Sequence, residues 1–242
     1  MKKSLGSARG QKSFTHEQHS TAGALFREFI LGGQDGLVNV LGVILGMAVA
    51  TSSPRLVVVA GLAAAFAESF SMAAVAYTSG RAQEDYYKSE LAREDYEIDH
   101  FPETETKEIF DIYQAKVFQG RLLDEIVHRI TKDRKTWLNI MMKEELGLSK
   151  DFISPLKSGL IVGLAAMIGS IIPLAPFFFL AIKTAILWSV VISAVALFIT
   201  GAVEGKLTLG HWVRKGVELA LIGMGAALIG FLVGKWLGVS GS

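Results

Sequence analysis

The sequence predicts an all-α membrane protein that crosses the bilayer with five helices and carries a polar helical insert between the second and third. Three observations support this fold class. Hydrophobic residues make up 51% of the 242 residues and the mean hydropathy is +0.41, values too high for a water-soluble domain of this length. Five apolar runs reach the roughly 20 residues that a membrane-spanning helix requires. Charged residues are concentrated between the second and third of these runs.

Composition also excludes several classes of protein. The net charge of +1 gives no general attraction to nucleic acid. The chain has no cysteine, which rules out disulfides, thiolate metal sites and cysteine nucleophiles. It has no HExxH motif, no serine nucleophile beside a base and no phosphate-binding loop, so we do not expect an enzyme.

The uneven charge divides the chain into four parts. Residues 1–24 are polar and have no apolar core, so we expect an N-terminal tail rather than a secretory signal peptide. Residues 25–80 hold the first two predicted membrane helices, and residues 81–152 form the polar insert. Residues 153–242 hold the last three membrane helices, at about 153–173, 176–202 and 217–237.

The first predicted span, residues 27–50, contains a carboxylate. An ionisable group in a membrane helix costs about 2.5–3.5 kcal/mol on insertion scales and usually faces a partner helix, a cavity or an ion path. Asp35 is surrounded by glycines, which admit another helix at close range, and Asn39 follows one turn later. We therefore expect this span to pack against protein, with Asp35 directed at something cationic. The alternative is that Asp35 only hydrogen-bonds a neighbouring helix.

The second span, residues 56–80, follows a turn closed by Pro54. Glu68 and Met72 are four residues apart and share a helix face. If both helices end at one membrane surface, Asp35 and Met72 lie at the same depth, roughly 12 Å in at 1.5 Å per residue. A carboxylate and a thioether would suit a divalent transition-metal ion. The alternative for Met72 is that it only fills the core. Glu68, one turn deeper on the same face, is a candidate second ligand or proton carrier, or it is paired with Lys183 or a hydroxyl.

The insert carries 17 acidic and 12 basic residues and no apolar run of span length. We expect three helices: one that continues from the second span until Pro102 breaks it, one after Thr104, and an amphipathic one at residues 136–149. Acidic residues and methionines recur at helical spacing on these segments: Glu90, Glu94 and Glu97, then Glu105 and Glu108, then Met141, Met142 and Glu145.

Carboxylates on one helix face repel by a few tenths of a kcal/mol per pair. Two acidic faces joined by a short proline turn are therefore favourable if a cation lies between them. Oxygen-rich sites suit hard to borderline divalent ions, and an added methionine sulfur disfavours Ca²⁺ and Mg²⁺. For any single glutamate, a solvated helix surface with ordinary ion pairs is the favoured interpretation. For the whole set, the spacing favours a metal site.

Lysine and arginine near the ends of the spans predict the orientation. The N-terminal tail, the insert and the polar link between the last two spans carry most of them, whereas Arg55 and Lys235 mark the other side. We therefore expect a cytosolic N-terminus and insert, and a C-terminus on the opposite side.

Several stretches match one known family. They are QDGLVNVLGVILG and AESFSMAAVAY in the first two spans, KSELAREDYEI, PETETKE and WLNIMMKEELGL in the insert, and SPLKSGL at the third span. Together they identify a resemblance to the vacuolar iron transporter family over about residues 25–237. The resemblance implies a two-fold dimer of five-span protomers that exports cytosolic Fe²⁺ and related ions, with protons moving the other way. It implies no permanently bound cofactor.

The resemblance also implies site residues. Asp35 and Met72 fall on the membrane ligands of the family. The insert ligands fall on Glu94, Glu97, Glu105, Glu108, Glu145, Met141 and Met142. A glutamate of the vacuolar members aligns with Ala64, and Glu68, one turn later on the same face, is the candidate to replace it. We expect no ferritin-like domain ahead of the first span, so the resemblance gives no support for iron oxidation.

We therefore predict a prokaryotic-type exporter of Fe²⁺, with Mn²⁺ and other first-row ions as further candidates and protons as the counter-ion. Its transport pathway would include Asp35, Met72, Glu68 and Asn39. Its partners would be metal ions, the lipid bilayer of the cell inner membrane and a second copy of the chain. The alternative from a different class is a membrane-anchored metal sensor or storage scaffold that transports nothing.

Overall fold

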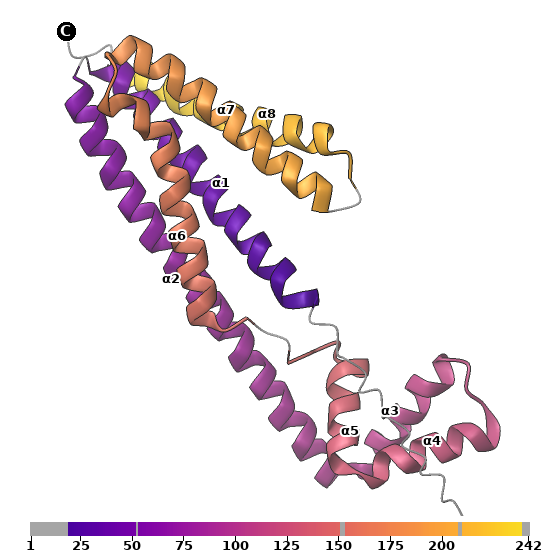
Figure 1. Cartoon of the computed structure of the whole chain (residues 1–242). Coiled ribbons are helices and arrows are strands. Elements are labelled where there is room, and N and C mark those ends of the chain that lie inside the picture. The colour runs from indigo at the N-terminus through magenta and orange to yellow at the C-terminus, as the bar shows by residue number, and fades with distance from the viewer. Residues whose placement is uncertain (1–18, 52, 151–152, 208–209, 239–242) are drawn as a thin grey trace, which may run out of the picture.

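The structure is a computed structural model that describes residues 19–51, 53–150, 153–207 and 210–238, and the described chain is helical without strands (Figure 1). Five of its helices are long and apolar enough to cross a membrane, as the sequence predicts. The predicted N-terminal tail lies outside the described residues up to residue 18. Residues 19–24, which we placed in that tail, are already helical, because helix α1 extends from His19 to Ala50.

Helix α2 joins the membrane part of the molecule to the insert. It begins at Pro54, where the missing N–H of proline costs no helical hydrogen bond, and it runs unbroken to His100. Its 47 residues span about 70 Å at 1.5 Å per residue, about twice the bilayer core. A new helix, α3 (Pro102–Ala115), starts at the proline predicted to break it.

The insert has one more helix than the three predicted. Residues that we had left without an element form α4 (Gly120–Lys132), a short helix with one strongly apolar face that buries Leu123, Val127 and Ile130. The predicted third helix is α5 (Arg134–Ile140) followed by the π-helical turn η1 (Met141–Glu145). These segments and the end of α2 enclose a core of their own, which includes Ile109 and Trp137.

The remaining spans are α6 (Pro155–Leu174), α7 (Ile182–Leu207) and α8 (Trp212–Gly238). The predicted start of the fourth span at residue 176 is wrong. Residues Ala175–Phe178 form a 3₁₀ turn, η2, that continues α6, because Pro176 cannot donate the next α-helical hydrogen bond. Helices α7 and α8 form a hairpin, and α8 runs back toward the end of the bundle that is farthest from α3, α4 and α5 (Figure 1).

Helix α1 lies inside the membrane bundle, packed mainly against α6 and α8 and also against α2. Its glycines make the close approach possible, as predicted. A Cβ atom on Gly36 would collide with the carbonyl oxygen of Ala166, and one on Gly169 of α6 would collide with that of Gly33. The adjoining apolar core includes Leu41 and Ile44. This packing fixes the position of the carboxylate that α1 carries.

Candidate metal-binding sites

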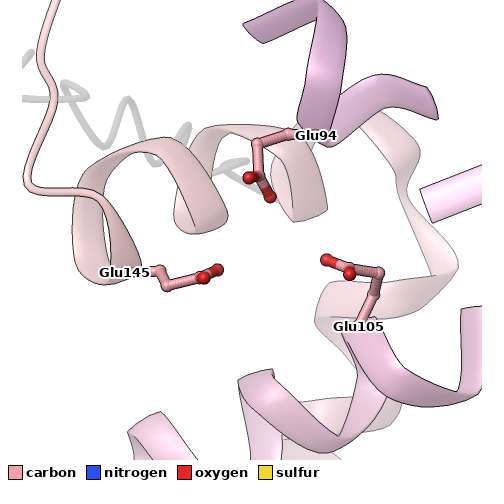
Figure 2. Close-up of side chains that lie close together, drawn as sticks. All are labelled: Glu94, Glu105 and Glu145. Carbon is pink, nitrogen blue, oxygen red and sulfur yellow. The ribbon is translucent and has the colours of Figure 1, made fainter. Parts of the chain in front are cut away.

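Three glutamates meet in the insert, each from a different segment. Glu94 comes from α2, Glu105 from α3 and Glu145 from η1, and one carboxylate oxygen of each lies within 4.8 Å of the others. Figure 2 shows the three side chains pointing toward one another. Glu94 is only 1% exposed and Glu105 4%, and in both residues Oε2 has no hydrogen-bond partner among the described residues. Buried carboxylate oxygens without partners are costly, so this cluster calls for a proton or a cation.

The electrostatics of the cluster favour protonation when no metal is bound. Burial raises the pKa of Glu94. Burial and then the negative charge of Glu108 raise the pKa of Glu105 to about 7. The same two causes, burial first, raise the pKa of Glu145 to about 7, although this residue is the most exposed of the three. A divalent ion entering near neutral pH would therefore displace protons.

The other glutamates predicted as insert ligands lie beside this cluster. Glu97 and Glu108 line a surface cavity of about 460 Å³ together with Glu105 and Glu145. Helical spacing and the break at Pro102 bring four of the five predicted carboxylates together, and η1 adds Glu145. Glu90 belongs neither to this cluster nor to the lining of the cavity, and it is paired with the guanidinium of Arg93 at 2.8 Å.

Arg93 is a residue that the sequence interpretation missed. Its Nη2 also lies 3.3 Å from Oε1 of Glu94, and its Nε lies 3.8 Å from Oε2 of Glu97. The signal was present in the sequence, because Arg93 follows Glu90 by three residues and precedes Glu97 by four, the spacings at which helical side chains pair. The cluster therefore has a fixed positive charge at one edge.

The two methionines predicted as insert ligands are both fully buried. Met141 packs in the core of the insert with Ile98, Ile109 and Trp137, so packing accounts for it. The π-helical turn that begins at Met141 is closed by the N–H of Leu146, which donates to the carbonyl of Met141. Such turns are frequent at functional sites, and this one carries Glu145.

Ion pairs on the outside of the insert hold the segments in register. Arg134, at the start of α5, donates to Asp95 at 2.9 Å and to Asp99 at 2.8 Å, both on α2. Lys116, just after α3, pairs with Glu144 of η1. These contacts fix η1 against α2 and α3, and so place Glu145 opposite Glu94 and Glu105.

Within the membrane bundle, Asp35 lies beside an acid and not beside a base. Its carboxyl group lies close to the side chains of Glu68 of α2 and of Asn39. The Asn39 side-chain amide donates to Oε1 of Glu68 at 3.0 Å. No lysine, arginine or histidine of the described chain forms a salt bridge with Asp35 or Glu68, so Asp35 does not face a fixed cation and Glu68 is not paired with Lys183. Two neighbouring carboxylates repel each other when both are charged.

Met72 is not level with Asp35, contrary to our expectation. Because Asp35 lies against Glu68, Met72 lies one turn nearer the insert, about 6 Å along the helix axis. There it lines a cavity of about 470 Å³ with Glu28, Leu31 and other residues of α1, α2 and α6. The expectation assumed that Arg27 and Gly80 mark helix ends at one surface. Both helices continue past these residues, so they do not define the register.

The fold defines a helical integral membrane protein, because five of its helices are long and apolar enough to cross a membrane. Two groups of carboxylates, one between α1 and α2 and one in the insert, make it a candidate to bind divalent cations. Comparison with known proteins gives the family. The sequence profile of the VIT family matches residues 26–235, and the chain belongs to this family.

Curated relatives support this membership. "Vacuolar iron transporter 1" from Tulipa gesneriana is 32% identical over 221 residues, which cover 90% of each chain. "Vacuolar iron transporter 1" from Arabidopsis thaliana is 34% identical over 90% of this chain and 88% of its own. "Vacuolar iron transporter" from Plasmodium falciparum (isolate 3D7) is 29% identical over 90% of this chain and 84% of its own.

Proposed function

We propose that this chain is a transporter that moves Fe²⁺, and as further candidates Mn²⁺ and other first-row divalent ions, out of the cytosol. The observation that carries the proposal is that the insert holds buried carboxylate oxygens without a hydrogen-bond partner, and that α1 and α2 hold a partly buried acid pair without a salt bridge to a fixed cation in the described chain. Such groups are stable in a fold when a proton or a metal ion neutralises them. The names of the relatives support iron as the substrate.

In this proposal the insert collects the ion. The carboxylates of Glu94, Glu105 and Glu145 form its centre, and Glu97 and Glu108 attract the ion from the adjoining cavity. Oxygen ligands suit Fe²⁺ and Mn²⁺, and Met142 would add a softer ligand. No permanently bound cofactor and no catalytic step are needed.

The ion then passes into the membrane bundle, toward Asp35, Glu68 and Asn39. The thioether of Met72 on the way costs a hard ion more than a transition-metal ion and so acts as a filter. Protons from the far side compete with the metal for Asp35 and Glu68. This competition couples metal export to proton entry, which is the simplest form of antiport, and the closeness of the two carboxyl groups supports it.

The proposal includes a homodimer in the cell inner membrane. An open groove of about 580 Å³ runs between α1 and α8, lined by apolar residues and by Asn39. A second copy packed there would enclose the α1 face on which Asn39 lies. We place the tail (residues 1–24) and the insert (81–152) in the cytosol, and the C-terminus on the opposite side. The membrane segments are residues 25–80 and 153–242.

The test is metal flux through the purified protein in proteoliposomes, measured for a panel of divalent ions at two pH gradients. We expect Fe²⁺ and Mn²⁺ to move, Ca²⁺ and Mg²⁺ to move poorly, and the rate to rise with an opposing proton gradient. A rate that does not depend on the pH gradient would contradict the coupling. Absence of any flux would favour the alternative of a sensor or storage scaffold, which the separate core of the insert supports.

A further inference from the structure

A cavity of about 470 Å³ lies between α1, α2 and α6, at the end of the bundle that faces the insert. Its wall includes Glu28 of α1, Met72 of α2 and Ser158 of α6. Glu28 is absent from the predicted site residues. It precedes Asp35 by seven residues, so the two carboxylates lie on the same side of α1, about 10 Å apart along the axis.

One oxygen of Glu28 is used and the other is not. The Ser158 hydroxyl donates to Oε1 at 2.7 Å, a contact that joins α1 to α6. Oε2 is shielded from solvent and has no hydrogen-bond partner among the described residues. Arg27 lines the same cavity, but it forms no salt bridge with Glu28 in the described chain. A shielded oxygen of this kind is costly unless a proton or a cation neutralises it.

The neighbouring acids on α2 are already neutralised. Glu84 is paired with Lys88 at 2.6 Å, Asp85 with Arg81 at 3.6 Å, and Glu90 with Arg93 at 2.8 Å. These residues occupy the part of α2 between Met72 and Glu94, about 33 Å at 1.5 Å per residue. A cation that moves from the insert cluster to the Asp35–Glu68 pair passes these paired acids. Among the described residues on this stretch, Glu28 is the carboxylate that such a cation can bind without displacing a lysine or arginine.

We propose that the Glu28 carboxylate and the Met72 thioether form a separate binding site for a first-row divalent ion, which the ion occupies between the insert and Asp35. This inference rests on the proposed function. Water would complete the coordination, because the cavity is open on one side and is large enough to hold several water molecules. The hydrogen bond from Ser158 orients the carboxylate, and the sulfur ligand favours a transition metal over Mg²⁺ or Ca²⁺.

The direct test measures Co²⁺ bound per chain, by equilibrium dialysis and elemental analysis of the full-length protein in nanodiscs. The parent carries Glu→Gln substitutions at Glu68, Glu94, Glu97, Glu105, Glu108 and Glu145 together with Asp35→Asn, which remove the carboxylates of the other two proposed sites. We expect the parent to hold one Co²⁺, and we expect both Glu28→Gln and Met72→Leu added to it to abolish this binding. Equal Co²⁺ binding by the parent and by both added variants would overturn the site.

The second test asks whether the site lies on the transport route. In the otherwise native protein, Glu28→Gln removes the negative charge but keeps an oxygen that can accept the hydrogen bond from Ser158. We expect Co²⁺ flux into proteoliposomes to fall at least tenfold in this variant. Ser158→Ala removes the hydrogen bond and keeps the charge, and we expect less than a threefold loss. Co²⁺ binding by the insert should be unchanged in both. A native rate in Glu28→Gln would overturn this place on the route.

The two tests separate this inference from the proposed function. If the native protein carries no metal but the parent binds Co²⁺ through Glu28, the transport proposal fails and the binding site stands. If the native protein transports Co²⁺, and Glu28→Gln changes neither the Co²⁺ binding of the parent nor the Co²⁺ flux of the native protein, transport stands and the site fails.

Discussion

The acidic side chains of the insert fall into two groups that differ in what neutralises them. Asp95 and Asp99 face outward and share the guanidinium of Arg134. Glu94 and Glu105 face inward and have unpartnered oxygens. In each residue of the second group one buried oxygen, Oε2, is free for a metal ion, although Oε1 of Glu94 is paired with Arg93. The shared position of these free oxygens, and not the number of acids, therefore favours a metal site.

Metal binding to the insert should release protons. The pKa values of Glu105 and Glu145, about 7 each, lie above the usual value for glutamate, so both carboxyl groups hold protons below this pH and lose them above it. We expect about one proton to be released per Mn²⁺ near pH 7 and almost none near pH 9, and we expect the affinity to fall as the pH is lowered below 7. Calorimetry of the native protein in buffers of different ionisation enthalpy measures this number directly.

The matched control is Glu105→Gln, which removes one of the two titrating groups and should roughly halve the number of protons released near pH 7. Proton release that is the same at both pH values would contradict the raised pKa values. It would mean that the three carboxylates are fully ionised before the metal arrives.

Arg93 should weaken metal binding, because its guanidinium competes for carboxylates that the metal needs. It lies 3.3 Å from Glu94 and 3.8 Å from Glu97. The guanidinium is half exposed, so solvent screens its effect, and we expect Arg93→Gln to raise Mn²⁺ affinity by only about three- to tenfold. Calorimetric titration at two salt concentrations checks this, with a larger gain at low salt.

Arg129→Gln is the control for Arg93, since Arg129 pairs with the exposed Glu125 of the same helix. We expect no change in Mn²⁺ affinity for this variant. Weaker binding by Arg93→Gln would show instead that the guanidinium is needed to assemble the cluster.

At the scale of secondary-structure elements, the contact between α1 and α6 sets the position of Asp35. Gly36 adjoins Asp35 in sequence and has no room for a Cβ atom, whereas a Cβ on Gly23 of the same helix would meet nothing within 4 Å. We expect Gly36→Ala to lower stability by about 1–3 kcal/mol, as overpacking does, and to reduce transport, while Gly23→Ala leaves both nearly unchanged. Thermal unfolding in detergent and metal flux measure the two effects. Equal behaviour of the variants would contradict the tight α1–α6 contact.

The sequence predicts the elements better than their register. Pro54 and Pro102 are helix signals that act locally, so the bounds of α2 follow from the residues around them. The level at which α1 meets α2 depends on packing between distant segments, and the same is true of the pairing of Glu28 with Ser158, 130 residues away. For this reason Met72 was placed one turn too deep, and Glu28 was not recognised at all.

At the scale of the whole molecule, one helix carries residues of all three proposed sites. Helix α2 holds Glu68 beside Asp35, Met72 in the cavity with Glu28, and Glu94 in the insert cluster. The insert and the membrane bundle each have a separate hydrophobic core, so α2 is the main physical link between them (Figure 1). Glu68 and Glu94 are separated by about 39 Å along this helix.

Helical spacing was enough to predict that glutamates of α2 and α3 lie close together, because each set lies on one face of one helix and Pro102 turns two faces toward each other. It could not show which acids are paired with fixed cations. That distinction depends on contacts such as Arg134 with Asp99 across two helices, which no local pattern encodes.

The central claim is that the carboxylate of Asp35 serves a moving cation rather than the packing of helices. The most direct measurement is the initial rate of Fe²⁺ entry into proteoliposomes for the native protein and for Asp35→Asn, together with Mn²⁺ binding by the insert in both. We predict that Asp35→Asn, which keeps the shape and can still hydrogen-bond Glu68, binds Mn²⁺ in the insert like the native protein but transports Fe²⁺ at least tenfold more slowly. A native transport rate in Asp35→Asn would contradict the claim.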